Sequence, residues 1–165
     1  MTTAGSTGED PTERSQWGPL RRLLTAMDDD IAALYAERGV VGVRPRFAAP
    51  LIRLSRAGSM TIRQLAESLG VTHSAMSQTV GAMRREGLVT SSPGADARTR
   101  EVTLTERAVA LVPFLEAEWR ATEDAVAELE AELPYAMSDV VRDIEAALSR
   151  RSFHDRIVRR LARDS

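Results

Sequence analysis

The chain has 165 residues, a formal net charge of −2 and no cysteine. This length suffices for a hydrophobic core but not for a small binding domain joined to a catalytic domain. Without cysteine, the chain has neither disulfides nor a thiol-based sensor. No apolar run approaches the length of a membrane span, and residues 1–15 lack the pattern of a signal peptide. We therefore expect a cytoplasmic protein that does not contact a membrane.

The charge is distributed unevenly along the chain. Residues 44–105 contain nine arginines against four acidic residues, a net charge of +5, whereas residues 1–43 sum to −3 and residues 106–165 to −4. Every basic residue is an arginine, which we attribute to genome composition rather than to function. The positive charge is thus concentrated in the central segment.

The N-terminal part predicts a tail followed by one helix. Residues 1–15 are polar and rich in small residues, so we expect them to be disordered. Apolar residues then recur at steps of four and three until Arg38 and Gly39, which predicts an amphipathic helix within residues 16–43. These apolar residues are Leu20, Leu24, Met27, Ile31 and Leu34.

Two short capped helices follow in the central segment. Thr61 with Gln64 forms a capping-box pattern, and Gly70 provides the left-handed stop. Thr72 can cap a second helix with a buried stripe of Met76, Val80 and Met83. A turn of about three residues separates the two helices, which is the spacing of a helix-turn-helix.

The segment after the second helix predicts a β-hairpin. Gly87 ends the helix, and residues 88–90 and 100–104 alternate between apolar and polar side chains as strands do. Residues 92–98 form the predicted loop between them and are rich in turn-forming residues. Such a hairpin beside a helix-turn-helix would be a wing.

The segment TIRQLAESLGVTHSAMSQTVGAMRREGLV, followed by DARTREVTLT, resembles the winged helix-turn-helix of the MarR family of bacterial transcription regulators. The resemblance extends over roughly 45 residues, and its marks are the Asp-x-Arg of Asp96 and Arg98 and the Leu-Thr of Leu104 and Thr105. It implies a mostly α fold with a small β-hairpin wing, in which a DNA-binding domain at 44–105 lies between dimerisation helices at 16–43 and 106–165.

The C-terminal part predicts three helices. A heptad-like seam closes at Pro134, and Pro113 should kink its helix or split off a short first segment. A further helix begins at Ser138, and a last one uses Phe153, Ile157 and Leu161. So long a seam favours pairing with a second copy about a twofold axis, with an intramolecular bundle as the alternative. The seam comprises Ala108, Val112, Leu115, Trp119, Thr122, Val126, Leu129 and Leu133.

The candidate DNA contacts follow from this arrangement. Outward positions near the start of the second helix suit base edges, and Gln can bond adenine twice. Arginines on the helices and the hairpin suit phosphate, and helix-capping threonines can contact the backbone. By resemblance, Asp96 holds Arg98 or a neighbouring basic side chain at the wing tip, from which Arg98 could enter the minor groove. The alternative for each residue is a solvated surface. The candidates are Thr61, Arg63, Thr72, His73, Ser74, Ser77, Gln78, Arg84, Arg85, Asp96, Arg98 and Arg100.

Effector binding is expected from the resemblance, at the junction between the dimerisation helices and the DNA-binding domain. Aromatic and cationic residues there could hold a small aromatic or anionic molecule, with ordinary hinge packing as the alternative. These residues are Trp17, Tyr35, Arg44, Arg46 and Phe47. No metal or other cofactor is expected, because the histidines, His73 and His154, are far apart and no metal-binding or catalytic motif is present.

The sequence therefore predicts a sequence-specific DNA-binding transcriptional regulator and not an enzyme. We expect a homodimeric repressor that binds a palindromic operator in double-stranded DNA and is released by a small effector. The alternative is a winged-helix protein-interaction module without DNA binding. Gln78, Gly81 and Ala82 leave the second helix poor in charge and are the hints of that alternative.

Overall fold

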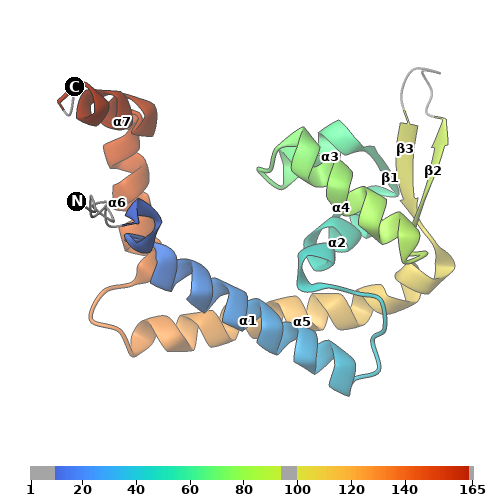
Figure 1. Ribbon diagram of the computed structural model, residues 1–165. Coiled ribbons are helices and arrows are strands. Elements are labelled where there is room, and N and C mark those ends of the chain that lie inside the picture. Colours follow the sequence, from blue (N-terminus) through green and yellow to red (C-terminus); the bar gives the residue numbers. More distant parts are fainter. Residues whose placement is uncertain (1–9, 94–99, 164–165) are drawn as a thin grey trace, which may run out of the picture. The chain divides into compact units, whose positions relative to one another are not determined.

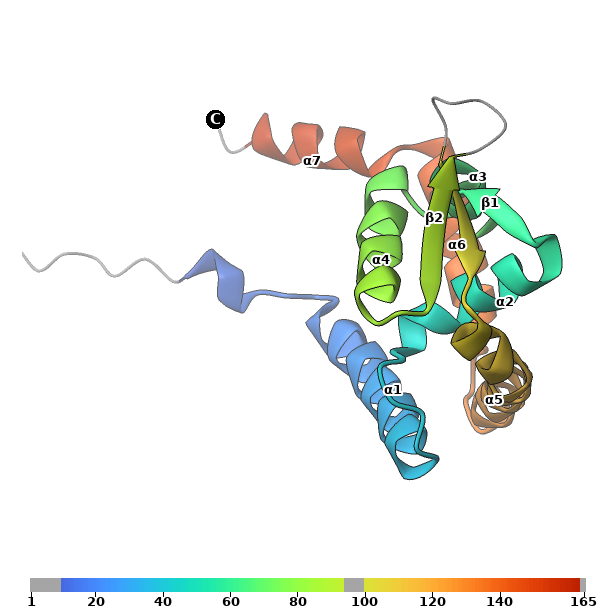
Figure 2. The same ribbon diagram turned by 90° about the vertical axis from the view of Figure 1, so that its right-hand side faces the viewer.

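The computed structural model of the chain describes residues 10–93 and 100–163 (Figures 1 and 2). The chain divides into two compact units, one up to Glu116 and one from Ala117 onward, with the boundary inside a long helix. Each unit is described by itself below.

The first unit holds most of the secondary structure. Its elements in chain order are η1 (Pro11–Glu13), α1 (Gly18–Glu37), η2 (Pro45–Phe47), α2 (Ala48–Ala57), β1 (Ser59–Thr61), α3 (Ile62–Ser68), α4 (His73–Arg85), β2 (Val89–Pro93), β3 (Arg100–Leu104) and the start of α5 (Glu106–Ala131). The second unit contains the rest of α5, then α6 (Met137–Arg150) and α7 (Phe153–Leu161). The predicted mostly helical fold with a small antiparallel sheet is confirmed.

The sheet has three strands in the order β1-β3-β2, all antiparallel. The hairpin β2–β3 was predicted, whereas the three-residue β1 was not, because so short a strand directly before a helix carries no alternation to detect. The predicted loop also began too early. Ser92 and Pro93 belong to β2 and pair with Glu101 and Arg100. Proline is tolerated there because β2 is an edge strand.

Two helices, α2 and α5, differ from the prediction. Helix α2 was missed because Pro50 suggests a helix breaker, yet Pro50 is the third residue of α2, where no backbone N–H is needed for the helix. On its apolar side, Leu51 and Leu54 are fully buried, as is Phe47 directly before the helix. Helix α5 continues through Pro113 without a break, so the predicted alternative of a separate first segment is wrong.

The hydrophobic core of the first unit is formed by side chains from every one of its α-helices and from the sheet. Tyr35 of α1 packs edge-on against Phe114 of α5, with ring centroids 5.7 Å apart. Other fully buried side chains are Phe47, Leu51, Leu54, Leu65, Met83, Leu88, Val102 and Leu115. Within residues 10–93 and 100–163, no helix is long and apolar enough to cross a membrane.

Candidate nucleic-acid interface

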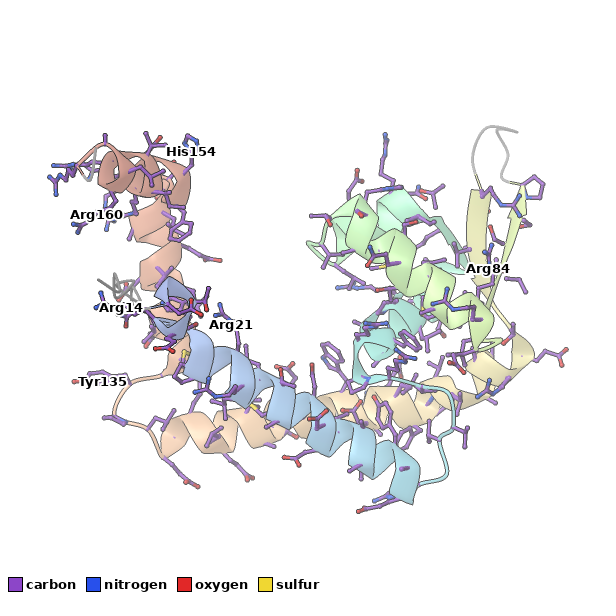
Figure 3. All side chains as sticks on the ribbon, in the orientation of Figure 1. Arg14, Arg21, Arg84, Tyr135, His154 and Arg160 are labelled. Atoms are coloured by element: carbon purple, nitrogen blue, oxygen red, sulfur yellow. The ribbon has the colours of Figure 1, made fainter. Side chains whose placement is uncertain are left out.

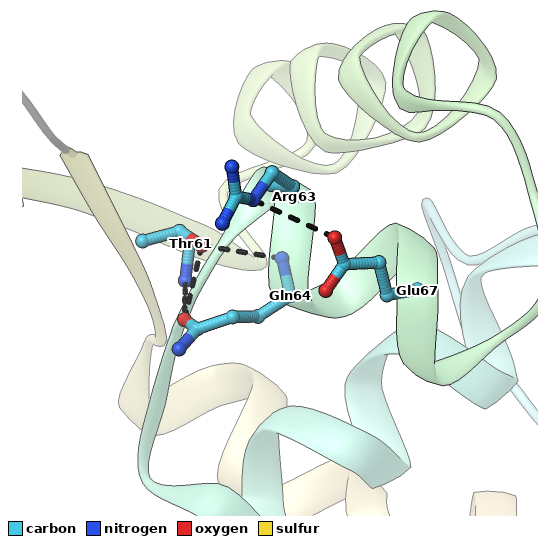
Figure 4. Close-up of polar contacts among 4 residues, drawn as sticks. All are labelled: Thr61, Arg63, Gln64 and Glu67. Carbon is cyan, nitrogen blue, oxygen red and sulfur yellow. Dashed lines mark hydrogen bonds and ion pairs between the residues drawn. The ribbon is translucent and has the colours of Figure 1, made fainter.

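Helix α3 begins with the predicted capping box (Figure 4). The hydroxyl of Thr61 accepts a hydrogen bond from the Gln64 backbone N–H at 3.2 Å, and Gln64 Oε1 accepts one from the Thr61 N–H at 2.9 Å. Two of the unpaired N–H groups at the helix start are thereby satisfied. The reciprocal bonds fix the direction in which α3 leaves the sheet.

The turn between α3 and α4 has the geometry that the sequence predicts. Gly70 adopts φ +64°, a left-handed conformation that favours glycine. Thr72 then caps α4, since its hydroxyl accepts a bond from the Ala75 N–H at 3.2 Å. The two helices and this turn form the helix-turn-helix.

Helix α4 has two chemically distinct faces. Met76, Val80 and Met83 are buried in the core, as predicted. Apart from Ala75, the exposed side is polar, and it contains no acidic residue. It comprises His73, Ser74, Ser77, Gln78, Arg84 and Arg85, and Figure 3 labels Arg84 at the C-terminal end of the helix. The exposed side therefore offers hydrogen-bonding groups along the helix and cations at its end.

Gly81 and Ala82 do not belong to that exposed face. Ala82 is buried, and Gly81 is half-buried with the tip of Arg85 near it. The lack of charge at Gly81 and Ala82 therefore concerns the inner side of α4 and not its exposed face. Gly81 and Ala82 therefore no longer favour the winged-helix protein-interaction module without DNA binding.

Arg63 lies in the first turn of α3 with its side chain 81% exposed. It forms an ion pair with Glu67 one turn later, at 3.5 Å (Figure 4). A pair this exposed contributes little to stability, so the guanidinium can exchange Glu67 for another anion at small cost. Thr61, Thr72 and Arg63 thus lie at the N-terminal ends of the two helices.

The wing arginine Arg100 is held by Ser91 of the neighbouring strand. Its Nε donates to Ser91 Oγ at 3.0 Å and its Nη2 donates to the Ser91 carbonyl at 2.8 Å. This fork braces the hairpin. Ser91 was not predicted, because its partner Arg100 is on the other strand of the hairpin. Asp96 and Arg98, the predicted wing-tip pair, lie outside the described residues.

The five candidate effector residues are not all brought together. Tyr35 and Phe47 are buried in the core, and the guanidinium carbons of Arg44 and Arg46 lie 6.0 and 5.6 Å from the centre of the Phe47 ring. Trp17 immediately precedes α1, and Tyr35 follows it by 18 positions, a span of about 27 Å along the axis. The structure therefore brings Arg44, Arg46 and Phe47 together, and Trp17 lies apart from Tyr35.

Within residues 10–93 and 100–163, no group of three or more His, Cys, Asp or Glu side chains is arranged to hold a metal ion. His73 is exposed at the start of α4, and His154 lies 3.5 Å from Asp155 on α7.

Comparisons with known proteins place the chain in a family. A MarR family profile matches residues 51–99. A MarR family transcriptional regulator from Silicibacter pomeroyi is 30% identical, over 78% of this chain and 93% of that one, with a TM-score of 0.50. The chain therefore belongs to the MarR family of transcriptional regulators, which are DNA-binding proteins and not enzymes.

Two further solved structures share the fold. The M. tuberculosis transcriptional regulator MOSR in complex with DNA is 22% identical, over 84% of this chain and 99% of that one, with a TM-score of 0.58. The S. aureus MepR–DNA complex is 16% identical, over 83% of this chain and 95% of that one, with a TM-score of 0.59. Among curated proteins, none matches the chain significantly.

The two faces of α4 should respond differently to mutation. Met83→Ala removes a fully buried side chain and should lower the free energy of unfolding by about 2–5 kcal/mol. Gln78→Ala, on the exposed face, should change it by less than about 0.5 kcal/mol. Chemical denaturation at one fixed protein concentration measures both. Equal losses would contradict the assignment of the faces.

Proposed function

We propose that the protein is a homodimeric repressor that binds a palindromic operator through α4 and is released by a small effector. The observation that carries the proposal is the polar, acid-free exposed face of α4, anchored from behind by Met76, Val80 and Met83. A helix seated in this way can enter the major groove with its N-terminal residues against base edges. Such a regulator acts in the cytoplasm, where bacterial DNA is located.

The residues divide by the part of DNA that they suit. Ser74, Ser77 and Gln78 lie in the first two turns of α4, where side-chain donors and acceptors reach base edges, and His73 precedes them. Arg63, Arg84, Arg85 and Arg100 supply charge for phosphates. The N-terminal N–H groups beside Thr61 and Thr72 suit the same anion. Asp96 and Arg98 complete the set by resemblance, at the wing tip.

Arg98 and Arg84 give a matched pair of tests. Binding is measured with a duplex enriched from a random library by the wild-type protein, over a range of salt concentrations. Arg84→Ala should flatten the slope of log affinity against log salt by about one, because one phosphate contact is lost. Arg98→Ala should weaken binding by about tenfold or more while the melting temperature stays unchanged.

Wild-type affinity in Arg98→Ala would contradict the minor-groove role of Arg98. If the wild-type protein enriches no sequence and binds no duplex at low salt, the DNA-binding proposal fails. The winged-helix protein-interaction module would then be preferred.

Dimerisation is proposed from the apolar surface of the second unit. Neither α6 nor α7 has a buried residue, although α6 carries Val141, Ile144 and Leu148 on one side. On α7, Phe153, Ile157 and Leu161 are 67%, 45% and 63% exposed. An apolar face formed by these six side chains indicates a protein partner. A second copy fits best, because a palindromic operator requires two α4 helices about 34 Å apart.

The dimer is tested by a charge placed on either side of α6. Leu148→Glu introduces a carboxylate on the apolar side and should convert the dimer to monomer at micromolar concentration. Ala146→Glu, on the opposite side of the same helix, should leave the dimer intact. Sedimentation velocity measures both. A wild-type monomer, or a dimer in both variants, would contradict the proposed interface.

Effector binding is proposed from the two arginines beside Phe47. Two exposed guanidinium groups beside the buried Phe47 ring suit an aromatic anion, whose charge can pair with the cations and whose ring can stack on a guanidinium. Benzoate is a suitable probe and should weaken binding of the enriched duplex by wild-type protein. Arg46→Gln should lose this response, and Arg22→Gln, on α1, should keep it. An unchanged duplex affinity in saturating benzoate would contradict a site for aromatic anions.

A further inference from the structure

Arg107 lies in the first turn of α5, where the positive end of the helix dipole disfavours a cation. An acidic residue would stabilise the helix at this position. Its guanidinium instead extends to two other segments of the first unit. The stability of α5 therefore does not explain an arginine at this position.

The guanidinium joins the end of α4 to the turn after α1. Arg107 Nη1 donates to the Glu86 carbonyl at 2.5 Å, and Nη2 donates to the Val41 carbonyl. Both acceptors are backbone atoms, and both bonds are charge-assisted. One side chain thus connects three segments that are distant in sequence.

The α4 side of this connection is rigid. Glu86 caps α4, and its N–H donates to the Ala82 carbonyl at 3.1 Å. Leu88 N–H donates to the Met83 carbonyl at 2.9 Å. The Glu86 carbonyl lies at the negative end of the α4 dipole, which favours a cation there. Arg107 therefore holds α4 by its C-terminal end.

The α1 side is equally well defined. Val40 N–H donates to the Tyr35 carbonyl at 2.8 Å, which fixes the turn to the last turn of α1. Gly42 has φ +75°, and a Cβ built there would lie 2.8 Å from Glu86 Oε2 and 3.2 Å from Arg107 Nη2. Only glycine allows this approach without strain.

Thr105 secures the start of α5 to the same place. Its hydroxyl donates to the Gly87 carbonyl at 2.9 Å, and its N–H donates to the Leu88 carbonyl at 3.0 Å. The Ala108 N–H donates to the Thr105 hydroxyl at 3.3 Å, so Thr105 also caps α5. The base of Arg107 is thereby fixed relative to the end of α4.

We propose that Arg107 is a positioning residue for DNA recognition, which sets the orientation of α4 by tying its C-terminal end to the turn after α1. This proposal rests on the proposed function. Displacement of the C-terminal end of α1 is passed through Val41 and Arg107 to Glu86 and hence to α4. Arg107 acts on specificity without touching DNA, because both of its described bonds are to the protein backbone.

The test compares the affinity for the enriched duplex with that for a scrambled duplex, at several salt concentrations. Arg107→Gln should lower the ratio of the two affinities by roughly tenfold, the order expected when a charge-assisted hydrogen bond is lost. Its salt slope should equal that of wild type. The matched control Arg85→Gln, on the exposed face of α4, should flatten the slope by about one and keep the ratio.

Gly42→Ala disturbs the same junction from the α1 side. It should lower the ratio as Arg107→Gln does, and the double variant should be no worse than the more affected single variant. Additive effects would overturn the proposal, as would an unchanged ratio or a flattened slope in Arg107→Gln.

Should Arg107→Gln not fold, Arg107→Lys replaces it. Lysine cannot donate to both carbonyls with the arginine fork, so the ratio should still fall, and an unchanged ratio would overturn the proposal. If wild-type protein does not discriminate between the duplexes, the proposed function itself has failed.

Discussion

The structure of the first unit depends on how one helix is seated. Helix α4 must bury Met76, Val80 and Met83 and still present a mostly polar face on its other side. Thr72 caps α4 at its start, and Gly87, with φ +67°, lets the chain turn away at its end. Burial of these apolar side chains supplies the stability. The exposed face of α4 is not needed for that burial, so its side chains can vary with the DNA sequence that is recognised.

A seated helix also needs a fixed orientation, and polar bonds at its two ends supply it. Thr61 and Gln64 set the direction of α3, against which α4 packs. Thr105 and Arg107 bind the other end of α4 to α5 and to the turn after α1. These bonds are directional, whereas hydrophobic burial is not, so a small change at the junction can move α4 without unfolding the core. Recognition and regulation can thereby share one set of contacts.

The caps, glycine turns and apolar stripes were predictable because each is a local pattern. Thr61, Thr72, Gly70 and the stripe of α4 were all identified in the sequence, as was the outward direction of Gln78 and Arg84. The missed features depend on distant partners. Helix α2 was hidden by Pro50, whose harmless position shows only once the helix start is known. Ser91 and Arg107 gave no signal, because their partners Arg100, Val41 and Glu86 are far away in sequence.

The central claim is that the exposed face of α4 contacts DNA. The most direct measurement is the change in backbone amide NMR shifts when the full chain, labelled with ¹⁵N, is titrated with the duplex that it enriches. The account predicts the largest changes at Ser74, Ser77 and Gln78, together with the first turn of α3. Changes concentrated on α6 and α7, with α4 unaffected, would contradict it.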